Sequence, residues 1–346
     1  SAAILHHLSI SSLIKFPLYE NGILSPLCQQ ILASDDTDFL YHAGSILANL
    51  AEDLNIRELM WEPTIVSALL VLSQANSENV DSQVARCICF MSTSHESERK
   101  LRKRMMEITL KLIASKNKQI ANDAVNAIGN FAKDEEGQLM LGDLKSFEPI
   151  VHLTGVTKEN TECGLSSCWA LSRFMIPDKN KALCSVNTPL FSHLMAMCGG
   201  SNIDGCMFAS TALCNIAALK ASHSFILQSG GITALLSLLR SNNHNAVLAG
   251  LKTLCNLCAS TAVRQRIVSE NGINILLGLV KERDVLLKEH AILTLCNLAI
   301  SPQYSKLVAA IGGVEIISDI IINFETKRTQ EASVLTLYNI SRNEDC

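Results

Sequence analysis

The side chains best suited to specific recognition chemistry in this sequence are asparagines that recur within apolar stretches. A carboxamide offers two N–H donors and a carbonyl acceptor. Within an apolar helix an Asn is unfavourable unless that amide has hydrogen-bond partners. The partners could be the backbone of a bound extended chain, or neighbouring segments of the same protein. Each of the following is succeeded by an apolar residue: Asn49, Asn130, Asn215, Asn256, Asn297 and Asn339.

These asparagines belong to a repeat. Weaker copies of the same pattern place Phe90 and Arg173 where the Asn stands elsewhere, and His7 lies where a further copy falls. By subtraction, successive positions in the set 7, 49, 90, 130, 173, 215, 256, 297 and 339 are 40 to 43 residues apart. We call these nine positions the anchors. A period of this length predicts a solenoid of stacked helical units.

A second recurring position lies four residues before each anchor, one helical turn away and on the same face. It holds Ser45, Arg86, Asn126, Trp169, Thr211, Lys252, Leu293 and Leu335. None of these residues or of the anchors that follow them is acidic, although the chain has a net charge of −4. Because Arg and Lys favour carboxylates and phosphates, Arg86, Arg173 and Lys252 favour an acidic or phosphorylated partner. The alternative is that three basic residues in such a set are near chance.

Trp169 precedes Arg173 by one helical turn, which suits stacking of the guanidinium on the indole. An exposed pair of this kind is typical of a binding hot spot. The alternative is a Trp packed between repeats.

The elements that must position these residues are helices. Gly-containing turns open a helix at residues 21–22, 230–231, 271–272 and 312–313, because Gly adopts positive φ without steric cost. A polar bend and a longer helix carrying the anchor follow, with apolar residues at helical spacing. Residues 95–200 keep the period without the Gly turns. We therefore predict one domain, 1–346, which is complete or a segment of a longer protein.

The period, the Gly turn and the small-Asn-apolar signature together resemble the armadillo repeat family, and fit it better than the related HEAT repeats. The resemblance covers essentially the whole chain and implies an all-α solenoid. That solenoid would be a right-handed superhelix of about eight three-helix repeats plus a partial N-terminal repeat. Its third helices would line a concave groove for an extended or helical protein segment. The groove residues would be Asn49, Arg86, Asn126, Asn130, Trp169, Arg173, Asn215, Lys252, Asn256, Asn297 and Asn339.

Composition narrows the function classes. With 48% hydrophobic and 18% charged residues, the chain can bury a core and is too apolar for disorder. A pI near 6.1 argues against general nucleic-acid binding. No apolar run is long enough to span a membrane, and no signal peptide is evident. We expect a cytoplasmic location, with the nucleus as an additional location.

The thirteen cysteines predict neither disulfides nor a metal site. Cys214, Cys255 and Cys296 occupy the slot before the anchor, which elsewhere holds Ala48, Gly129 or Ser172. The slot therefore selects for small size, and free Cys packs as a small hydrophobe. We expect these three thiols to be buried, reduced and inert. Cys255 and Cys258 have the spacing of a redox motif, but we interpret both as core residues of a repeat helix.

No pattern supports catalysis or a cofactor: phosphate loop, nucleophile elbow, kinase and zinc-protease motifs are all absent from the sequence. We therefore predict a scaffold or adaptor rather than an enzyme, of undetermined oligomeric state. One alternative is nuclear-import cargo binding, for which only Trp169 matches the expected Trp array, and basic cargo would be repelled by Arg86, Arg173 and Lys252. Others are a small-ligand-sensing module and a purely structural array.

Arg99, Lys100, Arg102, Lys103 and Arg104 form a separate basic cluster. This cluster could bind an acidic partner or a membrane surface. The alternative is that it is a solvated face of a helix without a binding role.

Overall fold

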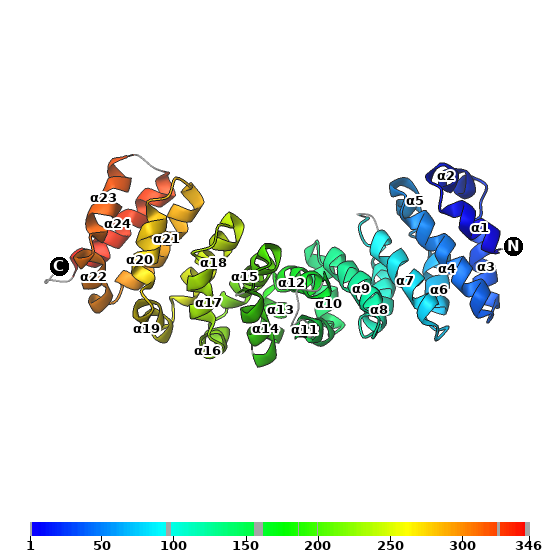
Figure 1. The fold of residues 1–346 in the computed structure, drawn as a ribbon, viewed down its shortest axis with the longest axis horizontal. Helices are drawn as coiled ribbons and strands as arrows, with labels where there is room; N and C mark the ends of the chain where they lie inside the picture. Colours follow the sequence, from blue (N-terminus) through cyan, green and yellow to red (C-terminus); the bar gives the residue numbers. More distant parts are fainter. Residues whose placement is uncertain are drawn as a thin grey trace. The chain divides into compact units, whose positions relative to one another are not determined.

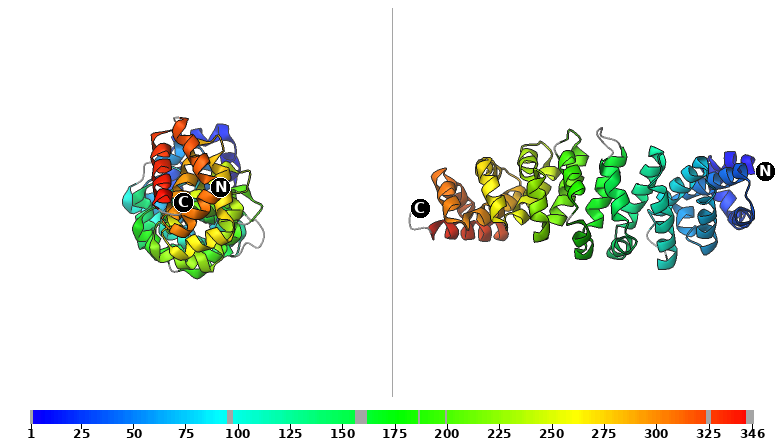
Figure 2. Two further views of the ribbon diagram at one scale, coloured as in Figure 1. Left: turned by 90° about the vertical axis from the view of Figure 1, so that its left-hand side faces the viewer. Right: turned by 90° about the horizontal axis from the view of Figure 1, so that it is seen from below.

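The computed structural model describes residues 2–94, 98–155, 162–185, 187–198, 200–323 and 326–342. Among these residues every regular element is a helix: twenty-four α-helices and one 3₁₀ turn, shown in Figures 1 and 2. The prediction of an all-α solenoid is confirmed.

The anchors lie near the C-terminal ends of the long helices, which we call the third helices. His7 lies in α1 (Ala2–Ser9), a partial first unit. The eight others lie, in order, in α4 (Thr37–Ala51), α7 (Glu78–Met91), α9 (Lys118–Phe131), α12 (Glu162–Phe174), α15 (Ile203–Ala217), α18 (His244–Leu257), α21 (Val285–Ala299) and α24 (Lys327–Ser341). Eight repeats and a partial one agree with the period of the sequence.

Further helices precede each third helix from α4 onward. They are α2 (Ser12–Glu20), α3 (Leu24–Ala33), α5 (Leu54–Leu59), α6 (Pro63–Leu72), α8 (Arg99–Leu112), α10 (Glu135–Asp143), α11 (Phe147–Gly155), α13 (Asp178–Cys184), α14 (Thr188–Cys198), η1 (Lys220–Ser222), α16 (His223–Gln228), α17 (Gly231–Leu238), α19 (Thr261–Ser269), α20 (Gly272–Val280), α22 (Pro302–Ala310) and α23 (Gly313–Ile322). Most repeats thus have three helices, and two are described in the repeat formed by α8 and α9.

The chain divides into two compact units, Ser1–Pro177 and Asp178–Cys346. In the first unit α1, α4, α7, α9 and α12 pack against one another in that order, and in the second unit α15, α18, α21 and α24 do the same. Each unit is therefore a stack of third helices (Figure 1). A single continuous array over 1–346 stays a prediction.

The stacks are held by apolar residues on both sides of each anchor. In α4, Leu47 and Leu50 are fully buried, and in α21 the corresponding Leu295 and Leu298 are fully buried as well. Burial at this helical spacing is what the apolar pattern predicts. The helices start at capping residues, for example Asp36, whose carboxylate accepts from the amides of the first turn of α4.

The Gly turns have two distinct requirements. Gly230 and Gly312 have φ of 75° and 79°, in the left-handed region. At the equivalent place Asn271 takes the left-handed conformation with φ of 62°, so the prediction that Gly supplies positive φ is wrong at this turn. The residue that follows is Gly for another reason. A Cβ on Gly272 would lie 2.7 Å from the backbone oxygen of Ile267.

The left-handed turn also persists in the central region, residues 95–200, which lacks the Gly turns. Lys145, between α10 and α11, has φ of 53°. A non-Gly residue in this region is strained. The turn geometry is therefore kept there while its sequence signature is lost.

Candidate binding surface on the third helices

We call the asparagines at the anchor positions the ladder, and in the first unit they connect neighbouring third helices. Asn49 Nδ2 donates to Ser9 Oγ at 2.9 Å, from α4 to α1. Asn130 Nδ2 donates to Ser92 Oγ at 3.1 Å, from α9 to the end of α7. Both acceptors are serines two residues beyond the preceding anchor, so these bonds repeat with the period of the stack.

In the second unit the acceptor is a backbone carbonyl. Asn256, Asn297 and Asn339 each donate through Nδ2, at 3.3 Å, to the carbonyl oxygen of the residue before the preceding anchor. Those acceptors are Cys214, Cys255 and Cys296. Such bonds engage Nδ2 of each amide and tie adjacent repeats together. Stabilisation of the stack, one of the two interpretations left open by the sequence, thus accounts for at least part of the ladder.

The ladder amides of the second unit keep hydrogen-bonding capacity. Asn256 is exposed and Asn297 is half-buried. For each of them the bonds to the described residues involve Nδ2 alone. Because Nδ2 carries two N–H groups, one donor and the carbonyl oxygen can serve a ligand. Asn215 is half-buried on α15 and also has an interaction partner.

Arg86 is tied to the ladder. Its Nη2 donates to Asn49 Oδ1 at 2.5 Å, so that Asn49 bridges α1, α4 and α7. Arg86 is half-buried, and its Nε is buried with no hydrogen-bond partner among the described residues. Asn126, one turn before Asn130, is half-buried. The structure therefore brings these predicted groove residues of the first unit onto adjacent helices.

Trp169 and Arg173 form the stacked pair that their spacing suggests. The guanidinium carbon of Arg173 lies 4.6 Å from the centroid of the Trp169 ring. The indole also packs on the preceding repeat, because a Cβ on Gly129 would lie 2.0 Å from its Cζ3. The half-buried ring fills the space that Gly129 leaves and carries Arg173 on its face, whereas a role of the pair as a binding hot spot stays a prediction.

Lys133 lies near Arg173 and adds a second positive charge to this surface, although the sequence did not identify it as a groove residue. It is exposed just after α9, and its Nζ donates to the Thr93 carbonyl at 3.1 Å. Burial lowers the pKa of Lys133, and the neighbouring charges of Arg173, Arg102 and Arg57 lower it further. Its position three residues after an anchor is the signal that could have identified it.

Lys252 is exposed on α18, one turn before Asn256. Across the stack, burial lowers the pKa of His290 on α21, and the charge of Lys252 lowers it further. At the equivalent positions Leu293 is half-buried and Leu335 is 50% exposed. At the described groove positions of the second unit, the surface therefore combines the Lys252 cation with asparagine amides and with the apolar Leu293 and Leu335.

A further recurring position, eight residues after the anchor, caps the third helices and was also missed. Gln138, His223 and Arg264 contact the carbonyl oxygens of Ala132, Ala217 and Cys258 at 2.9, 2.8 and 2.7 Å. Arg57 does the same at Ala51, at 2.8 Å, and lies over the Phe90 ring. These side chains satisfy carbonyls that a helix end leaves without partners. The residue type at this position varies among Gln, His and Arg, although each side chain contacts a carbonyl at a helix end. The position therefore cannot be recognised from residue type in the sequence.

The slot cysteines differ in exposure. Cys296 is buried as predicted, whereas Cys214 and Cys255 are half-buried, so the prediction of burial is wrong for these two thiols. Burial raises the thiol pKa of all three. The twelve described cysteines form no disulfide.

No group of three or more His, Cys, Asp or Glu side chains in the described ranges is arranged to hold a metal ion. Within the same ranges, no helix combines the length and the apolar character needed to cross a bilayer.

Comparisons with known proteins identify the fold. No protein-family profile and no curated protein matches this chain. Among solved structures, an engineered protein (structural genomics target OR497) superposes with a TM-score of 0.73 at 19% identity, covering 98% of this chain and 94% of its own. A second engineered protein (target OR329) has a TM-score of 0.64 at 22% identity, covering 69% and 97%. The designed armadillo repeat protein YIII(Dq)4CqI has a TM-score of 0.61 at 15% identity, covering 67% and 98%. The fold is therefore of the armadillo repeat type.

Proposed function

We propose that this chain is a non-catalytic interaction scaffold that binds an extended segment of a partner protein along its third helices. The observation that carries the proposal is the ladder. In each unit consecutive third helices pack against one another, and anchor asparagines donate hydrogen bonds to the neighbouring third helix. An extended chain presents backbone amides and carbonyls at regular intervals, and such a partner can be held by a periodic row of carboxamides.

The charges favour an acidic or phosphorylated segment. In the first unit Lys133 and Arg173 lie close enough for the charge of one to affect the pKa of the other. Asp134, the acid beside Lys133, is paired with Arg102 at 2.8 Å. A carboxylate or phosphate on the partner would offset the repulsion between the two cations. Basic cargo of the kind that import receptors carry would add to that repulsion, so we do not favour that alternative.

The proposed location is the cytosol, with or without the nucleus, since buried unpaired thiols suit a reducing compartment.

The test is selection of peptides from a display library of natural disordered segments, followed by calorimetry with synthetic peptides. We expect extended, acidic peptides, with affinity reduced by Arg173→Glu in the first unit or by Lys252→Glu in the second. Lys281→Glu, an exposed charge reversal just after α20, is the matched control and should not change affinity. Selected peptides that bind all three variants as tightly as the unmodified protein would show that the third helices are not the binding surface.

A further inference from the structure

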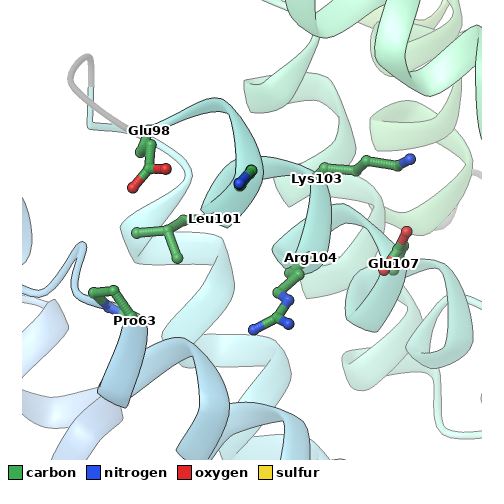
Figure 3. Close-up of a pocket in the computed structure, with 7 residues that line it drawn as sticks. Pro63, Glu98, Leu101, Lys103, Arg104 and Glu107 are labelled. Atoms are coloured by element: carbon green, nitrogen blue, oxygen red, sulfur yellow. The ribbon is translucent and has the colours of Figure 1, made fainter.

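A cavity outside the third helices lies between the start of α6 and the first turns of α8. Its volume is 420 Å³, and it is lined by Pro63, Glu98, Lys100, Leu101, Lys103, Arg104 and Glu107 (Figure 3). Cavities of this size hold small organic ligands. In Figure 3 Leu101 points toward Pro63, the Arg104 guanidinium lies on the same side of α8, and Lys103 extends the other way.

The five cations of the basic cluster at the start of α8 fall into two groups. Arg102 donates to the carbonyl of Phe131 at 2.7 Å and pairs with Asp134, and Arg99 lies 3.3 Å from Glu136. These two attach α8 to the C-terminal end of α9 and to the start of α10. Lys100, Lys103 and Arg104 are exposed, line the cavity, and form no ion pair with the described residues. The basic cluster is therefore partly structural, and its other part surrounds an open cavity.

The placement of these cations is unfavourable for the helix itself. The first turn of α8 contains no acidic residue, and the Glu98 side chain does not cap it. By contrast, the first turns of α7 and α10 carry acidic residues, as the helix dipole favours. Residues that are unfavourable for the local structure, and that form no stabilising contact in exchange, tend to mark functional sites. The ammonium of Lys100 has no ion pair or hydrogen bond with any residue that the structure describes, so its charge is not explained by packing.

We infer that the cavity between α6 and α8 binds a phosphate monoester. Arg104 presents a planar fork that matches two phosphate oxygens, and Lys100 supplies a second positive charge. Leu101 and Pro63 form an apolar wall that suits the organic part of an ester. Glu98 and Glu107 at the lining oppose a purely electrostatic attraction of any anion, and they offer acceptors to hydroxyl or amide groups of the ligand. The site lies on different helices from the ladder. The inference therefore does not depend on the proposed function, and each can be tested without the other.

The test measures the melting temperature of the whole chain with inorganic phosphate, glycerol 3-phosphate and N-acetyl-phosphoserine amide, each against chloride at equal ionic strength. Binding to the folded state raises the melting temperature in a saturable manner. We expect a saturable rise with the two esters and a smaller one with inorganic phosphate. A larger effect of glycerol 3-phosphate indicates a free small molecule, and a larger effect of the phosphoserine amide indicates a phosphorylated side chain.

Lys100→Glu and Arg104→Gln should abolish the rise. Lys100→Glu should also leave the ligand-free melting temperature unchanged or higher, because it places an acid in the first turn of α8. Loss of ligand response in this variant is then not a consequence of unfolding. Lys118→Glu is the matched control, since Lys118 is exposed in the first turn of α9 and does not line the cavity. No ester-dependent rise in the unmodified chain, or an equal rise in Lys100→Glu and Arg104→Gln, would overturn the inference.

Discussion

At the scale of single residues, the ladder asparagines have a structural role that is visible without any partner. The amide of Asn297 bonds the carbonyl of Cys255 one repeat away, and Asn256 and Asn339 do the same in their repeats. A residue that both spaces the stack and offers its remaining donor and acceptor to a ligand serves two functions with one side chain. The recurrence of Asn in apolar helices follows from the first role alone.

Replacement of Asn297 by Ala should therefore lower the free energy of unfolding by about 1 kcal/mol, the net worth of one hydrogen bond. Urea denaturation followed by circular dichroism measures it. An unchanged midpoint would mean that the inter-repeat bond contributes nothing to stability.

Buried thiols make stability depend on alkaline pH. Burial raises the pKa of Cys87 and Cys168 to about 12, whereas an unfolded thiol ionises several units lower. Above the unfolded pKa the unfolded state loses a proton that the folded state retains, so stability falls as pH rises toward 12. Each such thiol should cost about 1.4 kcal/mol between pH 8 and pH 10.

The check is the difference in unfolding free energy between pH 8 and pH 10 under reducing conditions. Cys168→Ala should reduce that difference by about 1.4 kcal/mol, whatever it does to stability at pH 8. If the variant shows the same pH dependence as the unmodified chain, Cys168 is not protected in the fold.

At the scale of elements, packing between adjacent third helices depends on matched pairs of large and small residues. Gly129 on α9 is such a position, because the Trp169 ring from α12 occupies the space where a Cβ would be. Gly278 on α20 offers a contrast, since a Cβ there would meet no atom within 4 Å. The same substitution should therefore have opposite effects at the two sites.

Gly278→Ala should stabilise the protein by about 1 kcal/mol, the usual gain in helix propensity. Gly129→Ala should lower stability by about 1 kcal/mol net, because overpacking costs more than that propensity returns. It should also change the fluorescence of Trp169 by displacing the ring. Equal stabilisation by both substitutions would show that the ring does not rest on Gly129.

The turn before α11 carries backbone strain at Lys145. Lys145→Gly should raise the free energy of unfolding by about 1 kcal/mol, because Gly adopts left-handed φ without the Cβ clash. Thermal and urea denaturation would both report it. A destabilised variant would mean that the Lys145 side chain contributes more than its backbone costs.

At the scale of the whole molecule, the repeat and its number could be predicted because burial imposes the same apolar spacing on every copy. The period located all eight third helices, and the Gly turns located helix starts in the second unit. A position at which different residue types have the same role could not be predicted. Its members contact carbonyl oxygens at the ends of third helices and are Arg57, Gln138, His223 and Arg264. Lys133 could not be predicted because its importance depends on Arg173 in the next repeat. The predicted groove residues lie on the third helices, and their role in binding stays a proposal.

The most direct test of the proposed scaffold function is a charge-exchange cycle between Arg173 and a bound acidic peptide. Arg173→Glu should weaken binding of the acidic peptide, and replacing one peptide Glu by Arg should weaken binding to the unmodified chain. Combining the two changes should restore affinity, with a coupling energy of about 0.5–3 kcal/mol by calorimetry. Losses that simply add for every peptide Glu tested would contradict the proposal that Arg173 on the third-helix surface contacts the partner.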